Sequence, residues 1–256
     1  MKKFMLDLIV TQNETLNSQY FLLKLSSSET LPEMLPGQFV EVLVDNAPNV
    51  FLRRPISINY VDRTSNELWL LIQIVGAGTQ QLATLQVNDK VNLILPLGNS
   101  FTLPKNKDQK ILLVGGGVGI APLLFWGSVL HNQGYECKFL LGGRSKENLL
   151  QLCEFESFGK VYTTTEDGSH GEKGFVTQHS LFKAPNFDVL YSCGPTPMMK
   201  AVGAYAALNE IFCEVSLENT MACGFGACLC CVTDTTEGHL CVCTEGPVFN
   251  ITKLKW

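Results

Sequence analysis

The sequence predicts a small antiparallel β-barrel, then a doubly wound α/β domain, then a short cysteine-rich segment. Three observations predict this order. Short strand-like runs separated by turn residues fill residues 1–105. Apolar strands that alternate with helical runs fill residues 106–217. Six of the ten cysteines fall within residues 223–243, inside the remaining segment 218–256.

The composition is that of a globular protein. The chain has 256 residues, 46% of them hydrophobic and 17% charged, with a net charge of −5. This length suggests two compact domains, and the charge argues against nucleic-acid binding, which calls for a basic patch. The amino terminus lacks the apolar stretch of a secretory leader, and free cysteines suit a reducing compartment, so we expect a cytoplasmic protein.

The uncharged stretch of residues 111–130 is long enough to cross a bilayer. Several glycines and Pro122 interrupt its middle. A strand, a glycine turn and a buried helix therefore explain it better, and we expect no membrane span.

The first domain is predicted as a closed barrel, because six short strands and one brief helix alternate with turn residues such as Leu35-Pro36-Gly37. The helix is expected near Thr79–Leu85. The expected strands are Phe4–Thr11, Tyr20–Leu25, Gln38–Val44, Ile56–Tyr60, Glu67–Val75 and Lys90–Leu95.

Two pieces of the barrel indicate binding. Arg53 and Arg54 stand beside Pro55 at a strand entrance, and guanidinium forks suit a phosphate or an electron-rich ring edge. The alternative is an ordinary surface pair. Val75–Thr79 runs from strand through glycines to a helix start, which offers free N–H groups to an anion. Many loops share that composition, so neither piece is specific alone.

The second domain opens with Ile111–Val114, an apolar strand typical of a parallel sheet buried on both faces. The glycine-rich stretch Gly115–Pro122 follows. It fails the strict G-x-G-x-x-G pattern, because Ile120 occupies the place of the third glycine. Its glycines still let the backbone approach a pyrophosphate at the start of the next helix.

Further strands are predicted at Tyr135–Leu141, Lys160–Thr164 and Asp188–Ser192. The last leads into Cys193–Met199 and a helix that ends near Leu208. Ligands of such sheets bind beyond the carboxyl ends of the strands, where both glycine-containing stretches lie. The alternative to a binding role for Cys193 is a purely structural role as a small buried residue.

The cysteine cluster indicates a metal site. Its first three members, Cys223, Cys228 and Cys231, have the C-x4-C-x2-C spacing of plant-type 2Fe–2S proteins. Spacing alone leaves the fourth ligand open between Cys243 and Cys241. A zinc site would show paired C-x2-C knuckles, and a disulfide framework belongs to small secreted chains. Gly224 and Gly226 permit a close bend of the backbone around an inorganic core.

The order of the motifs resembles the ferredoxin-reductase superfamily. The motifs on which this resemblance rests are Arg54–Ser57, Gly115–Pro122 and Cys193–Met198. Within it, Glu218–Gly224 and the closing Gly246–Phe249 resemble the electron-transfer subunits of class 1B dihydroorotate dehydrogenases. The resemblance covers nearly the whole chain, and the cysteine segment is its most specific part.

The resemblance implies three cofactors: FAD, NAD and a 2Fe–2S cluster. It prefers Cys243 as the fourth ligand, because in that family the last cysteine immediately precedes a charged residue and Gly-Pro. The implied cluster ligands are Cys223, Cys228, Cys231 and Cys243. The implied FAD residues are Arg54, Pro55, Ile56, Ser57, Leu71, Ile72, Gln73, Gly78 and Thr79. The expected NAD residues are Gly115, Gly116, Gly117, Gly119, Cys193, Gly194 and Pro195.

The implied function is electron transfer between NAD and a dihydroorotate-oxidising flavoprotein subunit, in a heterotetramer that serves pyrimidine (UMP) biosynthesis. The alternative is an NAD(P)H-dependent reductase subunit for ferredoxin, hydrogenase or sulfite reductase. No residue is expected to act as a catalytic acid, base or nucleophile, and the four histidines are expected in loops or on the surface. Arg144 and Lys146 favour a 2′-phosphate, and the resemblance favours NAD. Glu147, the only carboxylate close by, either opposes the phosphate or begins the next helix, where an acidic residue suits the dipole.

Overall fold

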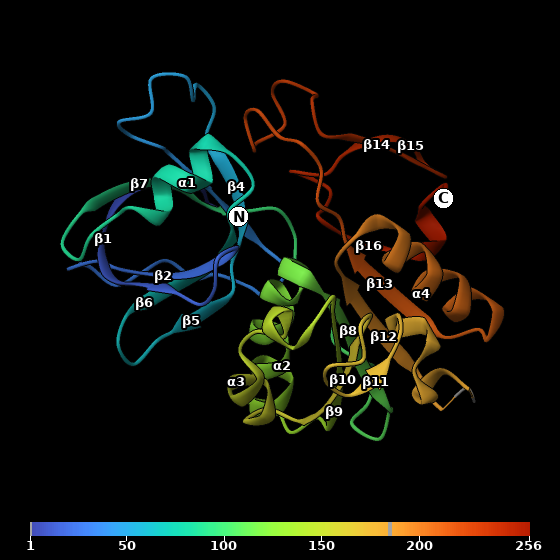
Figure 1. Ribbon diagram of the computed structural model, residues 1–256. Coiled ribbons are helices and arrows are strands. Elements are labelled where there is room, and N and C mark those ends of the chain that lie inside the picture. Colours follow the sequence, from blue (N-terminus) through green and yellow to red (C-terminus); the bar gives the residue numbers. More distant parts are fainter. Residues whose placement is uncertain (1, 184–185) are drawn as a thin grey trace.

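The computed structural model describes residues 2–183 and 186–256 (Figure 1). Within those ranges it contains two seven-stranded sheets and one two-stranded hairpin. The first sheet, blue to teal, lies beside the second sheet, green to orange, and the red carboxyl-terminal segment reaches back toward the first (Figure 1). The predicted order of barrel, α/β domain and carboxyl-terminal segment matches this arrangement. The predicted closure of the barrel is wrong, because the first sheet ends in two edge strands, β4 (Arg54–Ser57) and β5 (Tyr60–Asp62), and is an open half-barrel.

The first sheet is antiparallel, in the order β4-β3-β7-β1-β2-β6-β5. Its two edge strands, β4 and β5, follow each other in the chain. The Ile58 N–H donates to the Gln38 carbonyl and the Asn59 N–H to the Trp69 carbonyl, each at 3.0 Å, so the chain crosses from one edge to the other. This crossing divides the strand expected at Ile56–Tyr60 into two. The elements are β1 Phe4–Thr15, β2 Tyr20–Ser26, β3 Phe39–Val42, β4 Arg54–Ser57, β5 Tyr60–Asp62, β6 Glu67–Gln73, α1 Ala77–Ala83 and β7 Lys90–Leu97.

The second sheet has the order β11-β10-β9-β8-β12-β13-β16 and is parallel except for β16. Alternate residues of β8 enter opposite cores. Ile111 and Leu113 pack with α2, whereas Leu112 and Val114 pack with α4, so helices cover both faces. The elements are β8 Ile111–Gly116, η1 Gly117–Ile120, α2 Ala121–Asn132, β9 Cys137–Gly143, η2 Lys146–Asn148, α3 Leu152–Glu156, β10 Lys160–Thr165, β11 Glu172–Lys173, η3 Val176–Gln178, η4 Ser180–Phe182, β12 Val189–Cys193, α4 Thr196–Leu208, β13 Phe212–Ser216 and β16 Val248–Asn250.

The uncharged stretch at residues 111–130 forms the strand, turn and buried helix that we expected. In residues 2–183 and 186–256, no helix has the length and apolarity needed to cross a bilayer.

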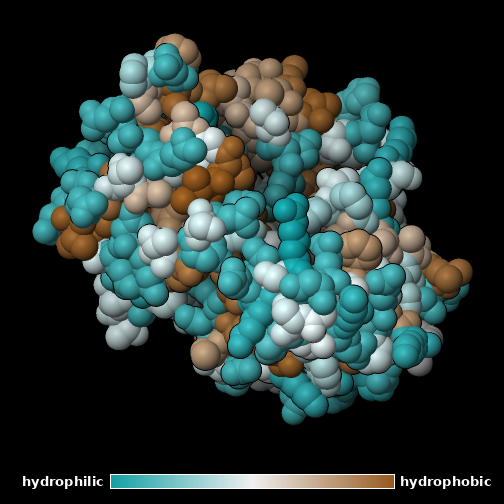
Figure 2. Space-filling model, in the orientation of Figure 1, coloured by the Kyte–Doolittle hydropathy of each residue, from teal (hydrophilic) through white to brown (hydrophobic). Residues whose placement is uncertain are grey.

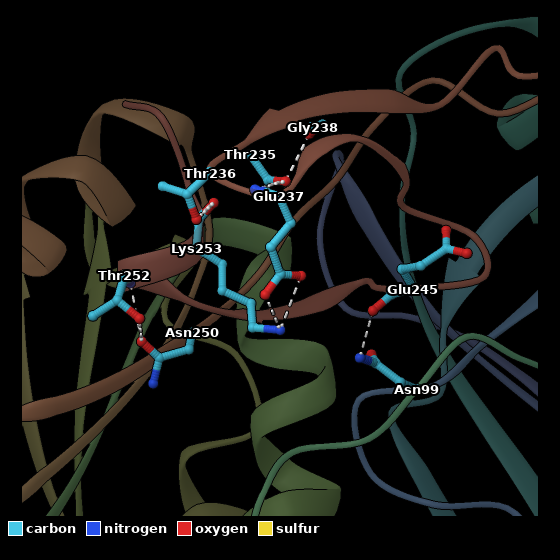
Figure 3. Close-up of polar contacts among 9 residues, drawn as sticks. All are labelled: Asn99, Thr235, Thr236, Glu237, Gly238, Glu245, Asn250, Thr252 and Lys253. Atoms are coloured by element: carbon cyan, nitrogen blue, oxygen red, sulfur yellow. Dashed lines mark hydrogen bonds and ion pairs between the residues drawn. The ribbon is translucent and has the colours of Figure 1, made fainter.

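The carboxyl-terminal segment is fastened to both domains. It contains the hairpin of β14 Val232–Thr235 and β15 Gly238–Cys241, then β16 and η5 Ile251–Lys253. From the barrel, the Asn99 amide donates to the carbonyls of Glu245 and Val248 at 2.8 and 2.9 Å (Figure 3). An ion pair of 3.0 Å between Lys253 and Glu237 ties η5 to the hairpin. β16 pairs with β13, so the segment bridges the two sheets.

Candidate functional site

A cavity of about 630 Å³ lies where β8, β9 and β12 end, at their carboxyl ends. Its walls include five of the expected nucleotide residues: Gly116, Gly117, Gly119, Gly194 and Pro195. Gly115 and Cys193 are buried in their strands and are not among the described lining residues. Gln73 and Tyr20 of the barrel also line the cavity, so it lies between the two domains.

The two glycine-containing stretches touch each other at this cavity. A β-carbon added to Gly119 would lie 2.4 Å from the Gly194 Cα and N atoms, closer than side chains approach. Gly194 itself has φ of +151°, in the region that favours glycine. The close approach leaves a wall of bare backbone, which is the kind of surface that a pyrophosphate needs.

Glu218 also lines the cavity, and the sequence analysis did not single it out as a site residue. Its carboxyl oxygen lies 3.9 Å from the Sγ atom of Cys193. The side chain is accessible from the cavity, yet the surrounding protein raises its pKa. Burial likewise raises the pKa of Cys193 well above its usual value, so that thiol holds its proton. The sequence offered one signal that could have identified Glu218 as a site residue, which is its position at the start of the cysteine segment.

At another part of the wall, the cavity is lined by Arg144, Asn148, Glu166 and Phe175. Neither Lys146 nor Glu147 is among its described lining residues, although the sequence analysis weighed both. At this part of the wall the lining carboxylate is Glu166, which directly follows β10. A linear pattern around β9 cannot reveal a residue supplied by the next strand of the sheet.

The two predicted flavin-binding pieces of the barrel lie against each other. A β-carbon on Gly78 would be 2.5 Å from Nε of Arg54, so that guanidinium occupies the space a side chain would fill. Within residues 2–183 and 186–256, Arg54 donates only to the carbonyls of Leu52 and Arg53, at 2.8 and 3.2 Å. Its planar fork is therefore held by neutral acceptors and remains available for an anion.

Arg53 has a structural role instead. It donates to the carbonyls of Glu41 and Asn92 at 3.2 and 3.1 Å and to the Asn92 side chain at 2.5 Å.

The hydroxyl of Thr79 accepts the N–H groups of Val75 and Gly76, at 2.9 and 3.2 Å, and so caps its own short helix.

The remaining predicted flavin residues divide by exposure. Pro55, Ile56 and Ser57 are half-buried on the edge strand β4. Leu71 and Ile72 are only 1% exposed and belong to the hydrophobic cores, so they offer backbone atoms only. Gln73, the last residue of β6, lines the cavity.

The cysteines of the last segment gather in two groups. The Sγ atom of Cys223 interacts with Cys228, and that of Cys231 interacts with both Cys241 and Cys243. Backbone N–H groups point at the sulfurs: that of Ala227 donates to Cys223 at 3.3 Å, and that of Cys243 donates to Cys231 at 3.4 Å. In a 2Fe–2S cluster each iron takes two cysteine ligands, so Cys223 with Cys228, and Cys231 with one of its two neighbours, suit this cluster. Among the described residues no group of three or more His, Cys, Asp or Glu side chains is already arranged to hold a metal ion.

The loop supports a thiolate at Cys223. Burial opposes ionisation there, but backbone N–H groups of Phe225, Cys228 and Ala227 outweigh it and lower the pKa to about 6. Cys243 is buried, which raises its pKa to about 12. A coordinated thiol is deprotonated by the metal itself, so burial of Cys243 does not prevent ligation. The ten cysteines, all in the described ranges, are free thiols, which excludes a disulfide framework.

Two cysteines lie outside the predicted ligand set. Cys230 is exposed, and Cys241 is half-buried and interacts with Cys231, as Cys243 does. The backbone N–H of Cys241 donates to Glu245 at 3.0 Å. Burial distinguishes the two neighbours of Cys231, because Cys243 is only 1% exposed, and Cys243 as the fourth ligand stays a prediction.

Gly224 brings the cysteine loop against the barrel. Its φ is +74°, and a β-carbon there would lie 2.5 Å from Cγ of Glu41, on β3. Glu41 is completely buried, and neither carboxyl oxygen has a hydrogen-bond partner among the described residues. Burial raises its pKa to about 7, while Arg53 and Arg54 act in the opposite direction and Cys223 adds to the rise.

One histidine departs from expectation. His179 lies in a loop but is buried, with Nδ1 accepting the Leu181 N–H at 3.1 Å and Nε2 3.4 Å from Glu172. The expected loop position therefore holds, but the side chain is buried because it caps the short helix η4.

Comparison with known proteins agrees with this geometry. Residues 218–255 match the family model for the iron–sulfur cluster binding domain of dihydroorotate dehydrogenase B, and residues 113–204 match the oxidoreductase NAD-binding domain. The chain is 39% identical over 249 residues to the dihydroorotate dehydrogenase B (NAD(+)) electron transfer subunit of Shouchella clausii, covering 95% of each chain. It is 36% identical over 252 residues to the same subunit of Fusobacterium nucleatum, again covering 95% of each. The chain belongs to this family of electron transfer subunits.

One solved structure has the same fold as this chain over nearly its whole length. The NADH-dependent reduced ferredoxin–NADP oxidoreductase involved in flavin-based electron bifurcation superimposes with a TM-score of 0.87, at 28% identity, over 97% of this chain and 90% of its own. A ferredoxin reductase of carbazole 1,9a-dioxygenase has a TM-score of 0.67 at 21% identity, over 81% of this chain and 65% of its own, and shows the fold alone. The predicted ferredoxin-reductase-like fold and the predicted family are both confirmed.

Proposed function

We propose that this chain carries electrons between NAD and a partner flavoprotein that oxidises dihydroorotate. The observation that supports it most is the coincidence of three sites in one chain: a nucleotide cavity with a glycine wall, an arginine beside a glycine on the barrel edge, and two neighbouring groups of cysteines. Two electrons leave dihydroorotate on the partner, pass through this chain and reduce NAD⁺ to NADH. The pathway served is pyrimidine biosynthesis.

Bound FAD exchanges two electrons with nicotinamide and single electrons with a 2Fe–2S cluster, and this conversion is the chemistry that the cofactors supply. The protein binds and orients them. Arg54 would hold an anionic or ring-edge group of FAD, with Pro55–Ser57 and Gly78-Thr79 beside it. Cys223, Cys228, Cys231 and Cys243 would hold the cluster. The glycines of the cavity would hold the NAD pyrophosphate, and Glu218 with Cys193 would border the end nearer the cysteine segment.

The partner surface is proposed at the end of the molecule that carries the cysteine loop. Large apolar side chains are exposed there: Phe225 and Leu229 on the cysteine loop are 46% and 63% exposed, and Phe51 on the barrel loop is 89% exposed. Both loops lie at the same end of the molecule (Figure 1), where Figure 2 shows brown and tan residues gathered. Exposed apolar patches of this kind mark protein interfaces. We propose a heterotetramer with two copies of each subunit, in the reducing cytoplasm, where free thiols persist.

The decisive experiment is co-expression with the catalytic flavoprotein and anaerobic purification. The expected result is a complex with flavin and iron–sulfur absorbance that reduces NAD⁺ when dihydroorotate is added, while the separated chain retains both cofactors. Replacing Phe225 by Ser should release the partner and leave both cofactors bound. A chain that purifies with neither flavin nor iron, or that passes electrons only to ferredoxin, would overturn the proposal.

A further inference from the structure

Glu41 is a buried ionisable group that the proposed electron path does not use, and it is the most buried carboxyl among the described residues. It stands on β3, directly opposite Pro55 of β4, and is 0% exposed. Its carboxyl oxygens have no hydrogen-bond partner among the described residues. A buried carboxyl in that state is costly, since an unsatisfied polar group loses its hydration without replacement. A group of this kind calls for an explanation in terms of function or an absent ligand.

The position of Glu41 supplies the explanation. One neighbour is β4, which carries Arg54–Ser57, and the other is Gly224, the residue after the proposed ligand Cys223. The carboxyl group therefore lies between the flavin edge of the barrel and the cysteine loop. The carboxyl group packs directly on that loop, because a β-carbon at Gly224 would lie 2.5 Å from Cγ and 2.8 Å from Oε1 of Glu41.

We infer that Glu41, in its ionised form, lowers the reduction potential of the 2Fe–2S cluster by placing a buried negative charge beside it. This inference rests on the proposed function, since it requires a cluster on the four cysteines. Net charge and solvent exposure are among the factors that fix such potentials. A carboxylate shielded from water disfavours addition of an electron nearby far more than one in solvent does. A lower cluster potential makes the reduced cluster a better donor to the flavin, the direction in which NAD⁺ is reduced.

The chain offers a matched control in Glu245. That carboxylate also lies near the site, where it accepts the Cys241 N–H at 3.0 Å, but its residue is exposed to solvent. Charge removal at Glu41 and at Glu245 therefore compares a buried with a screened carboxylate next to the same cluster.

The test is a redox titration of the holoprotein followed by the EPR signal of the reduced cluster, in buffer alkaline enough to keep the carboxyl ionised. Glu41→Gln should raise the midpoint potential, and by clearly more than Glu245→Gln. Glu41→Met should raise it too, which separates loss of charge from an amide newly donated to sulfur. Iron and FAD content should stay equal to those of the parent.

Three outcomes contradict the inference. The potential is unchanged in Glu41→Gln, it shifts no more than in Glu245→Gln, or it rises with Gln and not with Met. These outcomes presuppose that the parent shows the cluster signal. A parent protein without that signal would instead overturn the proposed function, so the two failures are distinguishable.

Discussion

The nucleotide cavity and the cysteine loop differ in what forms the site. Backbone forms much of the wall of the cavity, whereas side chains form the cysteine site. The cavity is walled by backbone at the ends of parallel strands, where Gly119 and Gly194 touch inside a buried sheet. The cysteine loop has little regular structure, and Cys228 and Cys230 in it are exposed. The first site is formed by the fold itself. The second consists of side chains on a loop that Asn99 and Gly224 merely hold against the barrel.

This difference predicts that the two sites fail independently. Damage to the cavity should abolish nucleotide binding and leave the metal in place. Damage to a cysteine should remove the metal and leave the cavity intact. Removal of iron with a chelator should likewise loosen residues 218–247, measured by hydrogen exchange, without loss of protection in β8 and β12.

The largest effect is expected for the fourth cysteine ligand. Cys243→Ser should lose the cluster or bind it only weakly, because a buried thiolate next to Cys231 is removed. Cys241→Ser should keep the cluster, since Cys241 is the less buried of the two cysteines that interact with Cys231. Iron and sulfide analysis with the visible spectrum measures both. A full cluster in the Cys243 variant, together with loss in the Cys241 variant, would reverse the assignment. Reduction of bound FAD by NADH should survive in both.

The complementary change is Gly119→Ala. The new β-carbon would meet the Gly194 backbone at 2.4 Å, and this contact cannot be relieved by a flexible side chain. Overpacking of this kind costs about 1–3 kcal/mol and displaces the wall on which the pyrophosphate would rest. We expect the KM for NADH to rise roughly tenfold to a hundredfold, as for misplaced binding groups elsewhere. Stopped-flow reduction of the flavin measures it. Equal loss of iron would show that the two sites are not independent.

A smaller effect is expected at the barrel edge. Arg54→Ala should weaken FAD binding, because a charge-assisted hydrogen bond contributes about 1.5–3 kcal/mol. Arg54→Lys keeps the charge and loses the planar fork, so its retention of FAD reports how much of the effect is geometric. Fluorescence of released flavin gives both dissociation constants. If Arg54→Ala holds FAD as tightly as the parent, Arg54 is an ordinary surface residue.

The sequence predicted the two domains and most of their strands because these depend on local periodicity and turn residues. It could not predict residues brought in by tertiary structure. Glu41 becomes notable only when Gly224 packs on it, and Glu166 only when β10 lies beside β9. Arg53 and Arg54 are adjacent in sequence, yet one ties strands together and the other is free to bind. The separate assignment of individual flavin, nucleotide and cluster residues stays a prediction.

The smallest expected effect concerns nucleotide choice. Arg144 lines the cavity and by itself favours a 2′-phosphate, but Glu166 lines the same wall and opposes one. Both side chains are exposed, so solvent and salt screen them, and an exposed charge contributes about 0.2–1 kcal/mol. Glu166→Gln should therefore raise kcat/KM for NADPH by at most roughly fivefold and leave NADH nearly unchanged. Glu147→Gln is the matched control, because Glu147 is exposed but not among the described lining residues, and it should change neither nucleotide. Parallel steady-state assays with NADH and NADPH measure kcat/KM for each nucleotide in the parent and both variants. A parent enzyme that prefers NADPH, and loses this preference on Arg144→Ala, would show that the arginine dominates the cavity and that Glu166 does not select the nucleotide.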